Sequence, residues 1–407
     1  MVTYPKDWKE CRINELLAEK PQNGLTKPKA VRGSGVKMVG MGELFAQPHI
    51  TNVDMARVPV TKSEMKNYEL KMNDLLFARQ SLVLEGAGKC SIIADIKEPT
   101  VFESHLIRAR IDEDKADANF IFYWFNHTQG RNAILSLISR VAAAGVRSSE
   151  LVKIRITLPS SVYEQKAIAA TLSSFDTHID NLTALIEKKK AIRDGVLSDL
   201  MSGRTRLAGF NGEWETKTIG CCVDIYQGGT PLTYRDDYWG GDIVWITPGE
   251  ITKLKSLYIG DSERKITDRG LENSSAVLLP VGAILLCTRA TIGDLAISSC
   301  LVTTNQGFKN LICRDDTDNV FFAYLLKKYK DVMIERAKGT TFLELSKTSL
   351  SNIFVALPPL AEQKAIAAIL TSMDTEIQNL EAERDKMQAI REGAIEDLLT
   401  GRVRLPL

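Results

Sequence analysis

The residues that come nearest to a catalytic pattern lie in the glycine-containing stretch Leu84-Glu-Gly-Ala-Gly-Lys-Cys90. A phosphate-binding loop needs an earlier glycine at a fixed spacing and a Ser or Thr directly after its lysine. Here the earlier glycine is missing and Cys90 follows Lys89. The stretch therefore predicts a β-turn and not a nucleotide site.

Other catalytic patterns are incomplete as well. Gly33-Ser-Gly35 lacks the third glycine and the helix of a dinucleotide site. Asp95-Ile-Lys97 has half the spacing of a nuclease carboxylate motif, without the Pro-Asp that should precede it. The four histidines lack the spacing of zinc ligands, and no Asn/Asp-Pro-Pro-aromatic motif of an amino-methyltransferase is present. We therefore expect a chain without catalytic residues, metal or cofactor of its own.

Composition sets broad limits on the protein. The 407 residues carry a formal net charge of +1, so any surface for a polyanion has to be a local basic patch. The length predicts two or three domains with cores of their own. Seven cysteines without paired spacing favour a reducing, cytoplasmic environment. No apolar run approaches the ~20 residues that a membrane span needs.

One stretch occurs twice and organises the chain. Residues Glu164–Leu207 and Glu362–Leu405 align without a gap at a constant offset of 198 residues, and more than half of the aligned positions are identical. Chance does not produce such a match. The sequence is therefore an internal duplication whose period is longer than that of any solenoid or propeller repeat.

Both copies have the apolar spacing of a coiled-coil helix, with alternating steps of four and three residues. We expect each helix to pair with the other copy and to end at a glycine, Gly203 or Gly401, after an entry at Leu158-Pro159 or Leu357-Pro358. The expected helix-pairing residues are Ile168, Leu172, Phe175, Ile179, Leu182, Ile186, Ile366, Leu370, Met373, Ile377, Leu380 and Met387.

The repeated stretches EQKAIAATLSSFDTHI and EQKAIAAILTSMDTEI, each followed by a Gly-Arg tail, resemble the two conserved helical regions of the specificity subunit of type I restriction-modification enzymes. The resemblance covers the whole chain. It implies an α+β fold with two mixed α/β target recognition domains, separated by two long antiparallel coiled-coil helices in a pseudo-two-fold internal repeat. The implied recognition domains are residues 1–157 and 208–356, and the implied helical regions are residues 158–207 and 357–407.

The resemblance also implies a function. Each globular domain, called a head below, is expected to read one half of a bipartite, asymmetric double-stranded DNA target, and the chain itself is expected to be non-catalytic. The paired helices would set the spacer between the half-sites and dock two methyltransferase subunits that use S-adenosylmethionine. Restriction and translocase subunits that use ATP and Mg²⁺ would complete this phage-defence system.

The duplication predicts where the chain ends meet. Trp8 and Trp214 begin the two heads, so the tail after Gly401 should lie near Trp8 in a nearly circular molecule with a head at each end. Helices of about 38 residues would span roughly 57 Å at ~1.5 Å per residue. That length is on the order of one and a half turns of B-DNA, as in two-headed DNA readers.

The two heads are weakly similar and should share one fold. Leu75-Leu-Phe-Ala-Arg79 matches Leu285-Leu-Cys-Thr-Arg289, and the aromatic start of a helix at Phe120, running towards Ile138, matches Phe321-Phe-Ala-Tyr324. The match places Arg79 and Arg289 at equivalent positions. Divergent heads on repeated helices favour two readers of different targets.

Direct readout of DNA needs Arg, Lys, Asn, Gln, Ser or Thr side chains at base edges, with further cations on phosphates. Arg79 and Arg289 are the strongest candidates, although a structural salt bridge explains their match equally well. The candidates in the first head are Lys27, Lys29, Arg32, Lys37, Arg79, Gln80, Ser81, Lys89, Arg147, Ser148 and Ser149. Those in the second are Gly229, Thr230, Trp245, Thr247, Thr288, Arg289, Thr291, Thr304, Asn305, Gln306, Lys338, Thr340 and Thr341.

Two other functions stay open at this point. A coiled-coil scaffold with protein-binding heads would bind its partner without the steep salt dependence of DNA binding. A self-sufficient restriction or methylation enzyme would need a catalytic motif that the sequence does not contain.

Overall fold

The computed structural model describes residues 4–81, 83–138, 144–339 and 343–406. The chain forms two compact units, Met1–Asn181 with Asp385–Leu407, and Leu182–Arg384. The long helices α6 (Val162–Met201) and α13 (Leu360–Thr400) each contribute residues to both units. The division between the units therefore falls within the helices, because the helix ends are built into the cores of the heads.

The first head contains a five-stranded sheet of order β2-β10-β6-β8-β4, a three-stranded sheet β5-β3-β9 and the pairs β1-β12 and β7-β11. Its elements are β1 (Trp8–Arg12), β2 (Gln22–Asn23), β3 (Val36–Val39), α1 (Met41–Ala46), β4 (His49–Ile50), β5 (Arg57–Val58), α2 (Lys62–Tyr68), β6 (Leu75–Ala78), β7 (Gln80–Ser81), β8 (Cys90–Ile93), β9 (Thr100–Phe102), β10 (Leu106–Ala109), α3 (Ala118–Asn126), α4 (Thr128–Leu137), β11 (Ala144–Gly145), α5 (Ser148–Leu151) and β12 (Arg155–Pro159).

The second head repeats this topology, with sheets of order β14-β21-β18-β19-β16 and β17-β15-β20 and the pair β13-β22. Its elements are β13 (Glu215–Thr218), α7 (Ile219–Cys222), β14 (Val223–Gln227), β15 (Trp239–Ile246), α8 (Pro248–Thr252), β16 (Tyr258–Ile259), β17 (Arg264–Ile266), α9 (Asp268–Glu272), β18 (Ile284–Cys287), β19 (Leu295–Ser298), β20 (Val302–Thr304), β21 (Phe308–Cys313), α10 (Asn319–Lys328), α11 (Lys330–Arg336), α12 (Lys347–Ser351) and β22 (Phe354–Leu357). The expectation that the two heads share a fold is confirmed.

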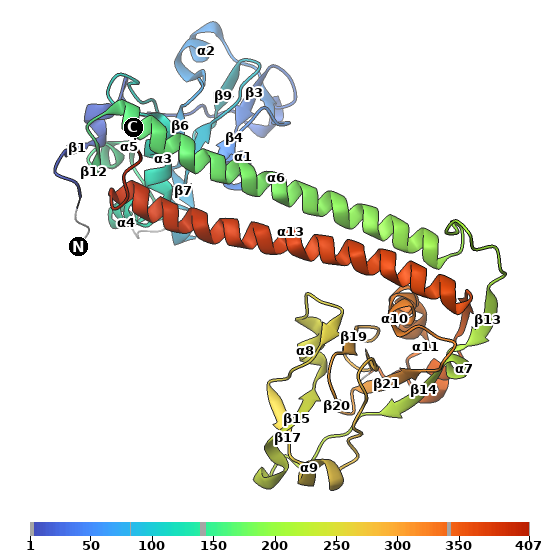
Figure 1. The fold of residues 1–407 in the computed structure, drawn as a ribbon. Helices are drawn as coiled ribbons and strands as arrows, with labels where there is room; N and C mark the ends of the chain where they lie inside the picture. The colour runs from blue at the N-terminus through green and yellow to red at the C-terminus, as the bar shows by residue number, and fades with distance from the viewer. Residues whose placement is uncertain (1–3, 82, 139–143, 340–342, 407) are drawn as a thin grey trace. The chain divides into compact units, whose positions relative to one another are not determined.

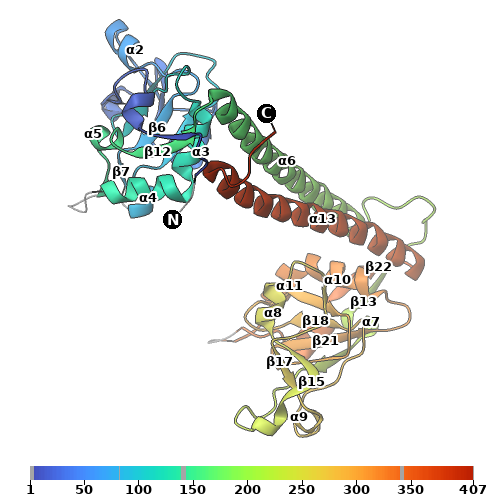
Figure 2. The same ribbon diagram turned by 60° about the vertical axis from the view of Figure 1, so that its left-hand side comes forward.

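The central strand of each five-stranded sheet is buried on both faces. In β18, Ile284 and Leu286 pack with α10 and α11, whereas Leu285 and Cys287 pack with the three-stranded sheet. Successive side chains of a strand point to opposite faces, so a continuous apolar run fits a strand between two layers. The helices α10 and α11 lie beside this sheet in Figure 2.

The helix expected from Phe120 to Ile138 is two helices, α3 and α4, with a break at His127. His127 has extended backbone angles, and the start of α4 packs against the end of α3. A Cβ atom at Gly130 would lie 2.2 Å from the carbonyl oxygen of Trp124, so only glycine permits this approach. The sequence prediction of one helix was wrong because it overlooked this close packing.

Within each unit, α6 and α13 lie side by side and antiparallel (Figure 1). In the second unit Lys189 pairs with Glu376 at 2.6 Å and Arg193 with Asp374 at 3.4 Å, so partner numbers fall as numbers along α6 rise. All twelve expected pairing residues are buried or half-buried. Four of them do more than pair the helices, because they pack in the cores of the heads: Ile168, Leu172, Ile366 and Leu370.

The end of each long helix lies against the start of a head. Gly203 and Gly401 have φ of +67° and +69°, the left-handed conformation expected after a helix. A Cβ atom at Gly401 would come within 3.1 Å of the Trp8 ring, and Arg404 pairs with Asp7 at 3.0 Å. The tail after Gly401 therefore lies near the N-terminus, as the duplication predicts.

The first two residues of the repeated motif hold these joints together. Glu164 accepts hydrogen bonds from Arg404, and Glu362 accepts them from Arg206 at 2.7 Å. Both carboxylates are buried, and hydrogen bonds to its carboxylate partners raise the pKa of each arginine. Each pair joins the start of one repeat to the tail of the other, which explains why the glutamate and the Gly-Arg tail recur together.

Gln165 and Gln363 connect the motif to the heads. The Gln165 side-chain oxygen accepts from the Asp117 backbone N–H at 2.9 Å, and its amide donates to Pro159 O at 2.8 Å. Gln363 makes the same two bonds to Asp318 and Pro358, each at 2.9 Å. A side chain with both donor and acceptor is needed, so glutamine is conserved between the two copies.

Candidate nucleic-acid interface

Loops that carry sequence-predicted DNA contacts converge in the second head. The loop after β14 joins the end of β20 through Gly229 N–H to Thr304 O at 2.8 Å. The residue after β18 joins the turn between β20 and β21 through Thr288 N–H to Gly307 O, also at 2.8 Å. Three segments that lie far apart in the sequence therefore form one surface.

The tips of these loops present polar side chains. Thr230 donates a hydrogen bond to the side-chain oxygen of Gln306, and Gln306 is exposed. The Asn305 side chain accepts from Gly307 N–H at 2.8 Å and so fixes the turn. A Cβ atom at Gly228 would lie 1.9 Å from Asn305 O, so the loops meet this closely only at a glycine.

Four predicted DNA contacts in this head are buried: Gly229, Trp245, Thr288 and Thr304. The Thr288 hydroxyl donates to Gly307 O at 3.1 Å, and the Thr304 hydroxyl accepts from Asn310 at 2.7 Å. Trp245 is 5% exposed, and its indole N–H donates to Gly229 O at 2.9 Å. Their positions contradict direct contact with DNA, because their polar atoms are used to support the loops. Thr247 caps α8 and donates to Glu250 at 2.7 Å, which leaves it half-buried at the edge of the surface.

Arg289 lies on the rim of an open cavity of about 880 Å³, whose lining also includes Thr291, Ile292, Ile334 and Leu343. Its guanidinium group pairs with Glu344 at 2.9 Å, and Lys309 pairs with the same carboxylate at 3.2 Å. Desolvation raises the pKa of Glu344, but hydrogen bonds from Arg289 and Lys309 outweigh it and the net pKa is lowered. The carboxylate is therefore charged at neutral pH and orients Arg289.

Lys338 joins this group through its backbone, which pairs with Glu344. Thr340 and Thr341 lie outside the described residues.

Arg79 and Arg289 do not occupy equivalent positions. The last residues of β6 and β18 pair in the same way with the first residues of β10 and β21. The residue that follows is Arg79 in the first head and Thr288 in the second, and both donate a backbone N–H to the next turn at 2.8 Å. Arg289 therefore matches Gln80, and the sequence match was displaced by one residue.

In the first head, pairing of β7 with β11 places Gln80 opposite Gly145 and Ser81 opposite Ala144, shortly before Arg147 in the sequence. In addition, Val146 N–H donates to Arg79 O at 2.9 Å. Gln80 and Arg147 are exposed. Ser148 and Ser149 instead begin α5 and line a different cavity, of about 600 Å³.

Lys89 lies over the Phe45 ring and donates to Phe45 O at 3.0 Å. Arg131, which the sequence reasoning missed, donates to Glu85 O at 2.8 Å and so adds a cation near the same loop. Arg131 lies on α4, far from this loop in the sequence, so no sequence pattern predicts that its side chain reaches the loop.

The predicted DNA contacts around Gly33 in the first head are largely paired within the protein. Lys27 pairs with Glu64 at 2.9 Å and Arg32 with Glu103 at 3.8 Å. Lys37 is 7% exposed and donates to Asn52 and to Val53 O, both at 2.9 Å, so burial contradicts its assignment as a DNA contact. Lys29 is exposed in this loop.

In the described part of the chain, no group of three or more His, Cys, Asp or Glu side chains is placed to hold a metal ion. Among the same residues, no helix is long and apolar enough to span a bilayer.

The chain matches a family model twice. Residues 5–191 and 211–388 match the type I restriction modification DNA specificity domain. The specificity subunit of the type I restriction enzyme MjaIX from Methanocaldococcus jannaschii is 35% identical over 180 residues, which are 44% of this chain and 42% of that protein. The putative MjaX specificity subunit of the same organism is 25% identical over an alignment of 419 positions, which covers 98% of this chain and 95% of that protein. The chain thus spans less than half of the first relative and nearly all of the second.

Solved structures show the same fold. The S subunit of a type I restriction-modification system from M. genitalium has a TM-score of 0.61 at 18% identity, with 96% of both chains covered. A chain from a structure on complex assembly and conformational transition of the type I R-M system has a TM-score of 0.56 at 15% identity, with 99% of this chain and 100% of that chain covered. Because the family model matches most of the sequence in two repeats, this chain belongs to the family of type I restriction-modification DNA specificity proteins.

Proposed function

We infer that this chain is the DNA specificity subunit of a type I restriction-modification complex, in which each head reads one half of a bipartite target. The observation that supports this most directly is the pair of heads with one topology and different loop residues. Where the second head presents Arg289 beside Glu344, the first presents Gln80 beside Gly145. Different side chains on equivalent backbone fit two readers of different half-sites.

The catalytic steps belong to partner subunits in this proposal. Methylation would use S-adenosylmethionine on the methyltransferase subunits, and cleavage would use ATP and Mg²⁺ on the restriction subunits. The chain would contribute target choice and positioning, without a cofactor of its own.

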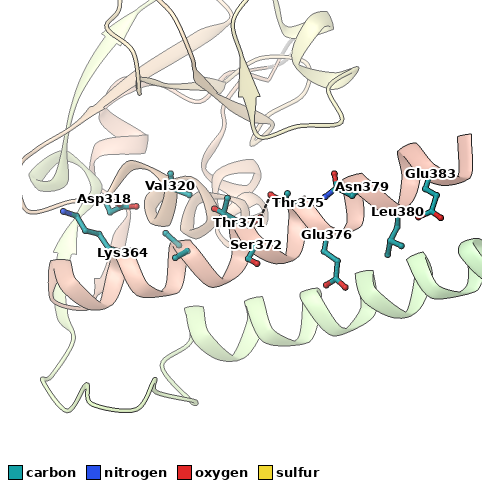
Figure 3. Close-up of a pocket in the computed structure, with 12 residues that line it drawn as sticks. Asp318, Val320, Lys364, Thr371, Ser372, Thr375, Glu376, Asn379, Leu380 and Glu383 are labelled. Atoms are coloured by element: carbon teal, nitrogen blue, oxygen red, sulfur yellow. Dashed lines mark hydrogen bonds between the residues drawn. The ribbon is translucent and has the colours of Figure 1, made fainter. Parts of the chain in front are cut away.

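The α13 helix offers a docking surface for a partner helix. A groove of about 750 Å³ runs along α13 beside the start of α10. Figure 3 shows Thr371, Thr375 and Asn379 along it. Its floor is made of small residues, Ala367, Ala368, Thr371, Ser372 and Thr375. Small side chains let another helix approach closely, and the first repeat has Ala or Ser/Thr at each matching position: Ala169, Ala170, Ser173, Ser174 and Thr177. The repeat therefore fits two methyltransferase subunits, one for each copy.

The test is modification-sensitive sequencing of DNA from cells that express this chain with its neighbouring methyltransferase. Methyl-adenine in a two-part motif with an unspecified gap is the expected result. Methylation at no defined motif, with the complex shown to assemble, would contradict the proposal and favour the scaffold with protein-binding heads.

Binding measured across a salt series separates the same two functions. DNA binding through several phosphates should weaken steeply with salt, by about 10³-fold or more between 50 and 200 mM for six or more contacts. A protein-binding scaffold should show a far weaker dependence.

A further inference from the structure

Arg264 is an exposed arginine of the second head with an unusual setting. Its guanidinium carbon lies 3.6 Å from the centroid of the Trp239 ring and 5.5 Å from that of Trp245. Among the residues that the structure describes, its guanidinium group has neither an ion pair nor a hydrogen bond, whereas its backbone oxygen accepts a hydrogen bond from the Ser262 hydroxyl. The nearby Arg235 and Arg269, by contrast, both pair with Asp237 at 2.9 Å.

The aromatic platform beneath Arg264 is fixed in place. Trp239 and Trp245 meet edge to face, with centroids 4.9 Å apart and planes at 88°. The indole of Trp245 donates to Gly229 O at 2.9 Å, and that of Trp239 donates to Leu232 O at 3.2 Å. Both rings are therefore oriented by the loop that follows β14, and the guanidinium plane is held by stacking.

This stack is continuous with the candidate interface. Arg264 begins β17, which pairs with β15, and both strands lie together in the second head (Figure 1). The loop that accepts the Trp245 hydrogen bond continues directly to Thr230, which binds Gln306. Arg264 thus extends the surface formed by Thr230 and Gln306.

A stacked guanidinium group with free N–H donors is suited to a pair of acceptor atoms. The fork of donors is planar and always charged, and it binds two acceptors at once. On DNA such pairs are guanine O6 with N7, or two phosphate oxygens. We propose that Arg264 binds such an acceptor pair in the second DNA half-site and that Trp239 sets its orientation. The inference rests on the proposed function.

The described residues of the first head show no counterpart of this stack at the matching position. Trp245 is the middle residue of the β15–β20 pairing, and Met38 is the middle residue of the equivalent β3–β9 pairing. The first head therefore has a methionine where the second head has a tryptophan. Methionine offers no aromatic face for an arginine. The contribution of Arg264 is therefore confined to the second half-site.

The test measures the DNA affinity of the complex that this chain forms with its methyltransferase. The probes are fluorescent duplexes that carry the methylated motif found by sequencing. Arg264→Ala should weaken binding by about 5-fold to 150-fold, the range of a single bidentate contact. The matched control is Arg269→Ala, which removes a paired arginine from the same region and should leave affinity unchanged. Intact folding is checked by the melting temperature of each variant.

The two sources of the acceptor pair give different results. If the acceptor is a guanine, the loss of affinity in Arg264→Ala depends on one base pair of the second half-site, and Arg264→Lys does not restore binding. The complex with Arg264→Ala then also methylates sites with other bases at that position. For phosphate oxygens, the loss is uniform across sequences, the salt slope of log K falls by about one, and Arg264→Lys partly restores binding. Either result supports the contact.

Trp239 provides a second variant. Trp239→Phe keeps an aromatic face and should bind nearly as the natural chain does, whereas Trp239→Leu should lose part of the affinity lost in Arg264→Ala. Unchanged affinity, salt slope and motif in Arg264→Ala would overturn the inference. The absence of bipartite methylation by the natural complex would instead contradict the proposed function.

Discussion

At the scale of single residues, the displaced match between the heads changes which side chain should read DNA in the first head. Gln80 occupies the place of Arg289, whereas Arg79 occupies that of the buried Thr288. Among the described residues, the Arg79 guanidinium group makes only a long contact to Ser104 O, at 3.4 Å. Base readout is therefore expected from Gln80, whose amide offers a donor and an acceptor.

Gln80→Ala should weaken binding of the first half-site by about 1–3 kcal/mol, the cost of losing a bidentate base contact. Arg79→Ala should leave the choice of base unchanged. Titration with duplexes that vary only the first half-site measures both. If only Arg79→Ala alters the base preference, Arg79 and not Gln80 reads the base, as the sequence match predicted.

The repeated glutamines should be important for stability. Gln165→Ala or Gln363→Ala would leave a buried N–H and a buried carbonyl without a partner at each helix entry. Each unsatisfied group costs about 1–3 kcal/mol, so the unfolding free energy should fall by that amount or more. Thermal denaturation checks this, with the exposed Lys166→Ala as control. Equal melting temperatures for the glutamine variants and the control would contradict it.

At the scale of elements, the groove on α13 can be tested without changing the loops that are proposed to contact DNA. Ala368→Trp should fill the groove and weaken assembly with the methyltransferase subunit, because the floor admits only small side chains. Ala382→Trp is the matched control, since this alanine is exposed on the same helix and does not line the groove. Size-exclusion chromatography of the mixed subunits measures assembly. Equal assembly by both variants would place the docking surface elsewhere.

The sequence was a good guide to elements that repeat or have strong periodicity. Both long helices and their terminal glycines follow from spacing alone, whereas only a few of the strands were expected from the sequence. The break at His127 could not be predicted, because it depends on α4 packing against Trp124. The convergence of loops at Gly307 and the stack around Arg264 are tertiary, and no spacing in the sequence brings their members together. Hydroxyls such as those of Thr288 and Thr304 suit both base contact and loop support, so only the structure separates the two roles.

At the scale of the whole molecule, the proposed function makes α6 and α13 the elements that set the spacer. Removing one heptad from both helices should change the number of unspecified base pairs in the methylated motif and leave both half-sites intact. Whole heptads keep the apolar seam in register, so the helices should still pair. Sequencing of methylated DNA reads the result directly, and altered half-sites would contradict a spacer role.

The tail after Gly401 packs with the first head, and this has a consequence for folding during synthesis. The second unit is continuous in sequence, from Leu182 to Arg384, whereas the first needs residues from both chain ends. Leu398 and Leu399 belong to the core of the first head, and Arg404 closes it against Glu164 and Asp7. Domains commonly fold in order from the N-terminus during synthesis. Here the head translated first cannot complete its core until Leu398, Leu399 and Arg404 leave the ribosome, so a chain that stops before them would display an unfinished first head and be an open substrate for proteases.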